Sequence, residues 1–349
     1  MRSIIVVCML VLFALPVRVS AQAARDYIYI VGSSTVYPFA TVVAERFGRS
    51  SEFRTPKVES TGSGGGLKLF CDGIGTDYPD VTNASRRIKP SEMSACVANG
   101  VRDIIEIKIG YDGIVVANAL AAPVLELGRR DLYLALARQV PGASPGEAVP
   151  NPYVLWSDIR PGLPDTRIEV LGPPPTSGTR DVLAELVMEY GCNAEEWVRD
   201  LRSTDPVKYR DFCHALREDG AFVEAGENDN LIVQKLEANP RAVGIFGFSF
   251  LDQNGDKVKG APIDGVEPSF DAIADYTYPV SRPLYFYVKK AHVDVIPGLR
   301  AFLVELTSER AWGEEGYLSY RGLIPMPLEE RAAVADEVLA LTPIAFASD

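Results

Sequence analysis

The 349-residue sequence has little histidine, little cysteine and no long apolar run beyond its first twenty residues. Only His214 and His292 could serve a nucleophilic serine as a base, and neither lies in a turn of catalytic type. No C-x-x-C pair, no Cys/His spacing and no Gly-Lys-Ser/Thr loop occurs. The G-x-S-x-G match "GASPG" (residues 142–146) lies in a Pro/Gly loop and is not a strand-to-helix elbow. We therefore expect that the chain binds no metal or cofactor and that it is not an enzyme. The less favoured alternative is a serine-dependent phosphate-ester hydrolase.

Positive charge is also scarce. The chain has 35 Lys and Arg against 47 Asp and Glu, so its formal charge is −12. Nucleic acids and anionic membranes bind basic surfaces, which makes both poor partners for this chain. A small anion is still permitted, because it can be bound by local dipoles while distant charges are screened over ~8 Å.

The one strongly apolar stretch is the run of twelve residues 4–15, which follows Arg2. It is too short to span a bilayer, and small residues precede Gln22. This pattern predicts a signal peptide over residues 1–21, cleaved near Ala21, rather than a membrane anchor.

Four cysteines remain after cleavage: Cys71, Cys96, Cys192 and Cys213. An even number in an exported chain suggests two disulfides, and four cysteines allow three pairings. We favour the local pairs, first with second and third with fourth, because they close short loops. Buried free thiols are the alternative.

Apolar runs of β type alternate with helical patterns along most of the chain. This alternation predicts α/β architecture with largely parallel sheets, and the length favours two lobes. Two β-branched runs follow residue 101, and we expect Gly110–Gly113 to split them into separate strands.

Three hydroxyl-rich and glycine-rich junctions each precede a helical pattern. They are "GSSTVYP" (Gly32–Pro38), "TGSGGG" (Thr61–Gly66) and "TSGTRD" (Thr176–Asp181). Each places Ser or Thr where an N-cap residue is expected, so ordinary helix capping is one explanation. The other is anion binding, because helix amino ends offer free N–H groups, glycine permits close approach and hydroxyls add donors. Three such junctions around one point would hold a tetrahedral oxyanion.

Seven segments occur in an order that resembles the phosphate-binding proteins of ABC phosphate importers, in the periplasmic-binding-protein superfamily. They cover nearly the whole mature chain: "GSSTVYPF", "TGSGGGLKLFCDG", "DVTNASRRIKPSE", "YDGIVVANA", "SGTRD", "GIFGFSF" and "YPVSRPLYFYV". The resemblance implies a two-lobed α/β fold of type II, two crossover hinge strands, a phosphate in the cleft between the lobes, and closure on binding.

The resemblance also implies a set of ligand-binding positions. In the first junction these are Ser34, Thr35 and the backbone of Val36, and in the second Ser63 with Gly64.

In the third junction the implied positions are Ser177, Gly178 and Thr179, with Arg180 as the cationic partner. An arginine fork suits two phosphate oxygens. The alternative for Arg180 is a surface arginine that pairs with a carboxylate on its own helix.

A buried aspartate of the family accepts the proton of hydrogen phosphate and rejects sulfate, and Asp80 in "PDVTNASR" is the matching position. The sequence departs from the family here, because Thr82 stands where glycine is usual; local capping is the alternative role for Asp80. Ser85 and Arg86 are further candidates; the alternative for Arg86 is a solvated arginine beside Arg87.

We therefore expect a periplasmic, monomeric solute-binding protein that captures inorganic phosphate and delivers it to the membrane permease subunits of an ABC importer. Lobe one would comprise residues 25–112 and 279–349, and lobe two residues 113–278. The alternatives are another oxyanion as ligand, or a receptor that senses phosphate.

Overall fold

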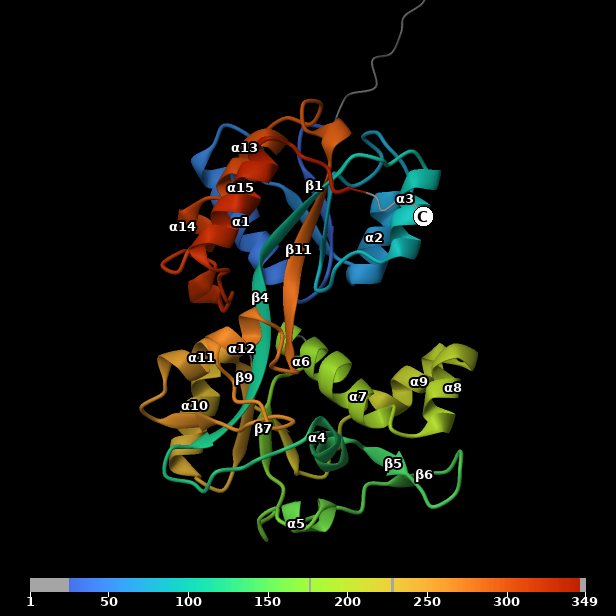
Figure 1. Ribbon diagram of the computed structural model, residues 1–349, viewed down its shortest axis with the longest axis vertical. Coiled ribbons are helices and arrows are strands. Elements are labelled where there is room, and N and C mark those ends of the chain that lie inside the picture. Colours follow the sequence, from blue (N-terminus) through green and yellow to red (C-terminus); the bar gives the residue numbers. More distant parts are fainter. Residues whose placement is uncertain (1–24, 176, 227–228, 346–349) are drawn as a thin grey trace, which may run out of the picture.

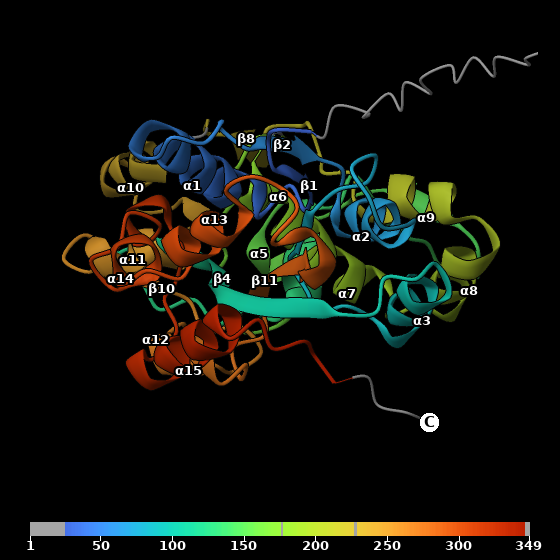
Figure 2. The same cartoon turned by 90° about the horizontal axis from the view of Figure 1, so that it is seen from above.

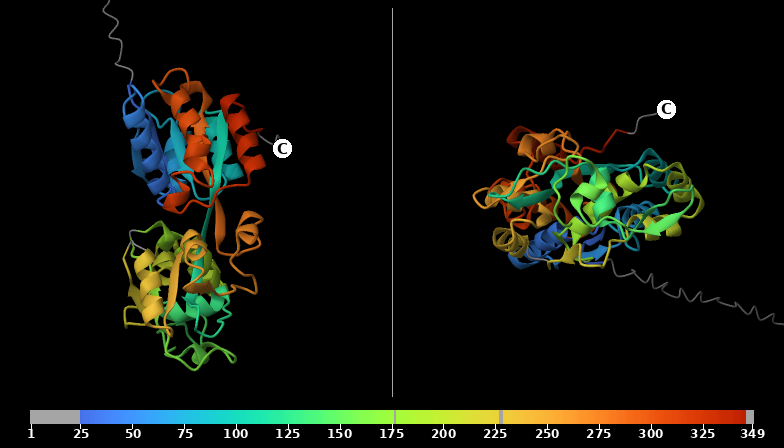
Figure 3. Two further views of the ribbon diagram at one scale, coloured as in Figure 1. Left: turned by 90° about the vertical axis from the view of Figure 1, so that its left-hand side faces the viewer. Right: turned by 90° about the horizontal axis from the view of Figure 1, so that it is seen from below.

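The computed structural model describes residues 25–175, 177–226 and 229–345. Two α/β lobes lie one above the other, and the long strands β4 (Ile104–Ala119) and β11 (Ser281–Lys289) run between them (Figure 1). Seen from the side, these two strands form the visible connection between the two bodies (Figure 3). The signal peptide expected over residues 1–21 and its cleavage near Ala21 lie outside the described residues.

Among the described residues, nine strands form one hydrogen-bonded sheet, and two short ones form a separate hairpin. The other strands are β1 (Tyr29–Gly32), β2 (Lys57–Ser60), β3 (Val81–Ala84), β5 (Gln139–Pro141), β6 (Ala148–Pro150), β7 (Val170–Gly172), β8 (Phe222–Glu224), β9 (Val243–Gly247) and β10 (Val258–Gly260).

Helices cover the sheet in both lobes. In lobe one they are α1 (Tyr37–Ser50), α2 (Ser63–Cys71), α3 (Pro90–Ala98), η2 (Lys290–His292), α13 (Leu299–Leu306), α14 (Glu309–Trp312), η3 (Ser319–Arg321) and α15 (Leu328–Leu339). In lobe two they are α4 (Arg129–Leu136), α5 (Trp156–Ile159), α6 (Gly178–Val182), the π-helix η1 (Leu183–Met188), α7 (Glu189–Cys192), α8 (Glu196–Thr204), α9 (Pro206–Cys213), α10 (Asp229–Ala238), α11 (Phe248–Gln253) and α12 (Phe270–Ala274).

The order of the strands explains how one sheet serves two lobes. Lobe one has the order β2-β1-β3-β11-β4, and the path continues into lobe two as β4-β9-β7-β8. The outer strands of each lobe are parallel, whereas β11 and β4 are antiparallel to each other. The expected split at Gly110–Gly113 is wrong, because β4 continues through these residues. Gly110 has a φ of +146°, and it pairs with Leu284 of β11. Directly after this pair, between Leu284 and Tyr285, the register of the two strands shifts by one residue, as in a β-bulge.

The register fixes which edge of the sheet faces lobe two. Strands β1 and β3 run parallel with Gly32 opposite Asn83, so both end at the same edge. Strand β3 is antiparallel to β11, with Val81 opposite Val288 near the far end of β11. The carboxyl ends of β1 and β3 therefore point toward the crossing between the lobes, which is where their following turns must lie.

Apolar helix faces and two disulfides secure this framework. Helix α1 buries Phe39, Ala40, Val43, Ala44 and Phe47 against the sheet and α13, and Figure 2 shows α1 and α13 side by side. The disulfide Cys71–Cys96 joins the end of α2 to α3, and Cys192–Cys213 joins the ends of α7 and α9. Both are the local pairs that the sequence favoured.

Candidate functional site

The first two junctions are neighbours at the carboxyl edge of β1 and β3. Helix α2 lies directly on this edge, because a methyl group at Gly66 would come within 2.5 Å of Gly32 Cα and 2.8 Å of Thr82 Oγ1. Only glycine fits such an approach of helix to strand. The amino end of α2 is thereby fixed beside the turn that follows β1.

The second junction is tied to the turn that follows β3. The Ser85 amide donates a hydrogen bond to Ser63 Oγ at 3.1 Å, and the two hydroxyl oxygens are 3.2 Å apart. Gly64 follows with open space, since a methyl group there would meet only Arg86 Nη2 at 4.0 Å. Ser63, Gly64, Ser85 and Arg86 are thus brought together from two segments of lobe one.

The third junction reaches the first one from lobe two. A methyl group at Gly178, the first residue of α6, would lie 3.0 Å from Thr35 Cα and 3.8 Å from the Ser34 carbonyl oxygen. The Ser34 hydroxyl donates a hydrogen bond to the carboxylate of Asp181 in the same helix. We call the set Ser34–Val36, Ser63–Gly64, Ser85–Arg86 and Ser177–Thr179 the three-junction site.

The hydroxyls of the first two junctions are not helix caps, which was one of the two explanations that the sequence left open. The N-cap residue of α1 is Val36, and that of α2 is Gly62 with φ 74; neither makes a side-chain cap. Only Ser177 caps its helix, by accepting a hydrogen bond from the Thr179 amide at 3.2 Å. Capping therefore does not account for the hydroxyls at Ser34, Thr35 and Ser63.

Arg86 supplies a cation at the edge of the site. Its two terminal nitrogens donate to the two carboxylate oxygens of Glu92 at 2.9 and 2.7 Å. Burial by itself would raise the pKa of Glu92, but the bonds from Arg86 and the Lys89 amide outweigh it and lower the pKa. Glu92 is therefore ionised, and the charge of Arg86 is largely balanced by it.

Arg180 does not contact the other two junctions, which corrects its expected place as the cationic partner. Its Nη1 donates to the Pro173 carbonyl oxygen at 3.0 Å, and its guanidinium lies over the Phe222 ring with 5.0 Å to the centroid. Burial lowers its pKa, and Glu224 at 3.9 Å opposes that shift. All these partners belong to lobe two, so the helix turns Arg180 away from lobe one.

Asp80 also lies outside the three-junction site, which differs from the place expected for it from the sequence. It precedes β3, at the opposite end of the strand from Ser85, which is a separation of about 16 Å for five extended residues. Its carboxylate is fully buried and accepts hydrogen bonds from Arg25 at 2.6 Å, the Tyr29 amide at 2.8 Å and His292 Nδ1 at 2.7 Å. These bonds join the amino ends of two strands, which is a structural role.

Arg282 is a member of the site that the sequence reasoning missed. It is only 6% exposed, and its Nη2 donates to Thr35 Oγ1 at 2.6 Å. It lies in "YPVSRPLYFYV", one of the segments that carry the resemblance. The available signal was a lone arginine beside a proline at the start of an otherwise apolar strand, because such a charge requires a buried partner.

Several buried polar atoms around the site have spare hydrogen-bonding capacity. In the described part of the chain, Thr82 Oγ1, Asn83 Oδ1, Asp112 Oδ2 and Arg282 Nε make no hydrogen bond. Burial raises the pKa of Asp112, and the nearby guanidinium of Arg282 opposes this shift. Unpaired buried groups are costly, and these four lie beneath the first junction and at the lobe crossing.

The histidines are placed where they cannot serve a serine of the site. His292 donates from Nδ1 to Asp80, and its Nε2 accepts from the Gly75 amide at 3.0 Å. The His214 ring bonds to Glu189 at 2.8 Å, near the end of the helical run 178–192 that begins at the site. Among the described residues, no cluster of three or more His, Cys, Asp or Glu could hold a metal ion.

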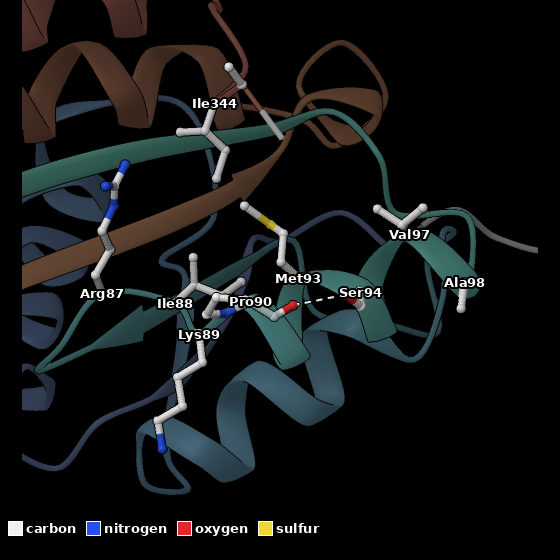
Figure 4. Close-up of a pocket in the computed structure, with 10 residues that line it drawn as sticks. Arg87, Ile88, Lys89, Pro90, Met93, Ser94, Val97, Ala98 and Ile344 are labelled. Atoms are coloured by element: carbon white, nitrogen blue, oxygen red, sulfur yellow. Dashed lines mark hydrogen bonds between the residues drawn. The ribbon is translucent and has the colours of Figure 1, made fainter. Parts of the chain in front are cut away.

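A separate pocket opens on lobe one beside α3 (Figure 4). Its volume is about 740 Å³, and Met93 and Ile344 approach each other across it. Ser94 uses its hydroxyl to bond the Pro90 carbonyl oxygen at 3.0 Å. No residue of the three-junction site lines this pocket, so it offers no support for anion binding.

Comparison with known proteins agrees with this architecture. A family model described as a PBP superfamily domain matches residues 19–310. Protein SphX of Synechococcus elongatus is 29% identical over 284 residues, covering 78% of this chain and 72% of SphX. Phosphate-binding protein PstS of Staphylococcus saprophyticus is 25% identical over 308 residues, covering 86% of this chain and 80% of PstS.

A solved structure gives the same result. The crystal structure of "a possible phosphate binding protein" from Planctomyces limnophilus has a TM-score of 0.69 and 26% identity, covering 90% of this chain and 98% of that chain. The helices within the described ranges are all too short or too polar to cross a membrane.

Proposed function

The chain belongs to the PBP superfamily, and on that premise we propose that it binds inorganic phosphate between its two lobes. The observation that carries the proposal is the meeting of Thr35 in lobe one with Gly178 in lobe two, at the edge of the sheet on which helix α2 also lies. The names of PstS and of the Planctomyces limnophilus protein support phosphate as the anion.

Each junction would contribute a different kind of donor. The hydroxyls of Thr35 and Ser63 can donate to the ligand without adding charge, and the amides at Val36 and Gly64 lie at helix amino ends. The Ser34 hydroxyl donates to Asp181 and would have to turn from it to donate to the ligand. In the third junction, Ser177, Gly178 and Thr179 form the start of α6, where Gly178 meets Thr35 of lobe one.

The cation of the site is not Arg180 in this proposal. Arg86 and Arg282 contact or adjoin the three junctions, whereas the contacts of Arg180 lie within lobe two. Donors to a charged ligand are worth about 1.5–3 kcal/mol each, so a few well-placed ones suffice for tight binding.

Asp181 replaces Asp80 as the proposed acceptor of the ligand's proton. Its carboxylate contacts the Ser34 hydroxyl and therefore lies at the meeting of the lobes. Hydrogen phosphate can donate a hydrogen bond to such an oxygen, whereas sulfate has no proton and would meet lone-pair repulsion. Asp181→Asn should lose this discrimination, so sulfate should compete measurably with phosphate in the variant but not in the wild type.

Delivery to the permease subunits of an ABC importer, a periplasmic location and a monomeric state complete the proposal. The lobes are proposed as residues 25–112 with 279–349, and residues 113–278. Binding would stabilise the arrangement in which Gly178 contacts Thr35, because only then do both lobes reach the ligand.

Calorimetric titration of the mature protein with phosphate tests the proposal directly. We expect one site per chain, and no competition from sulfate. Thr35→Ala and Ser177→Ala should each weaken binding by about 1–3 kcal/mol through loss of a donor. Ser308→Ala is the matched control, because Ser308 caps α14 far from the site by accepting from the Ala311 amide. Absence of phosphate binding would contradict the assignment. Phosphate affinity equal to that of the wild type in both site variants would contradict it as well.

A further inference from the structure

One arginine side chain lies at the crossing between the lobes. Arg282 is the second residue of β11 and is paired in register with Asp112 of β4. These two strands connect the lobes (Figure 1). The guanidinium is therefore placed at the point about which the lobes would move.

Its hydrogen bonds reach into both lobes. Nη2 donates to Thr35 Oγ1 in the first junction at 2.6 Å, and Nη1 donates to Glu185 Oε2 in η1, directly after α6. Nε lies 3.7 Å from Asp112 Oδ2, without a hydrogen bond between them. A single side chain thus touches the first junction, the helix of the third junction and both connecting strands.

The chemistry of these contacts has a direct consequence for Thr35. A guanidinium has only donors, so Thr35 Oγ1 must accept from it. The threonine proton is then free to point elsewhere, and the hydroxyl is fixed as a donor. Lobe separation would leave either Thr35 or Glu185 without its arginine, and a buried arginine that loses a partner is costly.

We propose that Arg282 is a positioning residue that couples anion binding to lobe closure. It holds the Thr35 hydroxyl as a donor to the ligand, and it ties lobe one to lobe two through Glu185. The inference rests on the proposed phosphate function for its ligand, while the tie between the lobes is measurable without ligand.

Glu185→Gln tests the tie with little risk to folding, because this side chain is 52% exposed. We expect phosphate to bind on the order of fivefold more weakly, as befits a partly exposed ion pair, with most of the change in the dissociation rate. Small-angle X-ray scattering should show a larger radius of gyration for the ligand-free variant than for the wild type. A merely structural ion pair would not alter the lobe arrangement.

Glu195→Gln is the matched control. Glu195 pairs with Arg130 at 3.1 Å, its exposure is 39%, and both residues lie within lobe two. Its removal should change neither phosphate dissociation nor scattering. Arg282→Lys keeps the positive charge but loses the two terminal donors of the guanidinium, so it should weaken phosphate binding more than Glu185→Gln does. The variant that combines Arg282→Lys with Glu185→Gln should bind phosphate as Arg282→Lys alone does.

Two results would overturn the inference. Unchanged dissociation and scattering in Glu185→Gln would mean that the pair does not link the lobes, and tighter phosphate binding would mean that Glu185 competes with the anion for Arg282. If the wild type binds no phosphate, the proposed function fails. The link between the lobes is then judged by scattering alone. A larger radius of gyration in Glu185→Gln than in the wild type supports the link, and an unchanged radius overturns it.

Discussion

Gly178→Ala is the most direct test of the contact between the lobes. The added methyl group would lie 3.0 Å from Thr35 Cα, about half an ångström closer than carbon atoms prefer. Overpacking of this kind costs about 1–3 kcal/mol. The Gly178 amide is retained, so the change probes the fit of the lobes rather than the loss of a donor.

The expected result is a loss of phosphate affinity of about five- to 150-fold, since each 1.4 kcal/mol is tenfold. The melting temperature without ligand should stay near that of the wild type, because the strained contact joins two lobes rather than filling one core. Titration calorimetry measures the affinity, and calorimetric melting with and without phosphate separates binding from folding.

Gly65→Ala is the matched control for this substitution. Its methyl group would meet Thr61 Cβ at 3.6 Å, which is an ordinary contact, and alanine favours a helix over glycine by up to about 1 kcal/mol. The control should therefore melt slightly higher and bind as the wild type does. An affinity for Gly178→Ala within twofold of wild type would refute the view that phosphate binds with Gly178 against Thr35.

Two further predictions concern stability. Burial lowers the pKa of Lys289 to about 7, while the unfolded chain has a pKa near 10.5, so between these values the unfolded state binds the extra proton and stability rises with pH. The free energy of unfolding should rise on the order of 4 kcal/mol from pH 7 to 10, at about 1.4 kcal/mol per pH unit. Urea titrations at several pH values should find this rise in the wild type and not in Lys289→Met. An equal dependence on pH in both proteins would contradict this reasoning. Replacing Cys71 and Cys96 together by serine opens a loop with a sequence separation of 25 and should cost about 3.5 kcal/mol in denaturant unfolding, and a loss below 1 kcal/mol would count against loop closure as the cause.

Much of the fold and the site followed from local pattern. The alternation of apolar strands and helices predicted α/β lobes, and the spacing of Cys71 with Cys96 favoured a local disulfide. The three junctions were recognisable because glycine and hydroxyl residues gather where strands end and helices begin. That Ser34 and Thr35 do not cap α1 was not visible, since the exact first residue of a helix is set by tertiary packing.

The individual side chains were harder to place. Arg180 was expected at the anion because it follows Thr179, yet successive helix residues point about 100° apart, and the helix directs it onto Phe222. Asp80 was expected there because it matches the buried aspartate of the family that the sequence resembles, yet five extended residues separate it from Ser85 at the other end of β3.

The sequence by itself determined the elements of this protein and the chemical character of its junctions, because periodicity, turn residues and hydroxyl content are local properties. The tertiary structure alone decided which charged groups meet there: Arg282, 247 positions after Thr35 along the chain, bonds to it, while Arg180 and Asp80 do not. The physical reason is that strand register and sheet order set the ends of β1, β3 and β11, and register depends on partners that lie far away in the sequence.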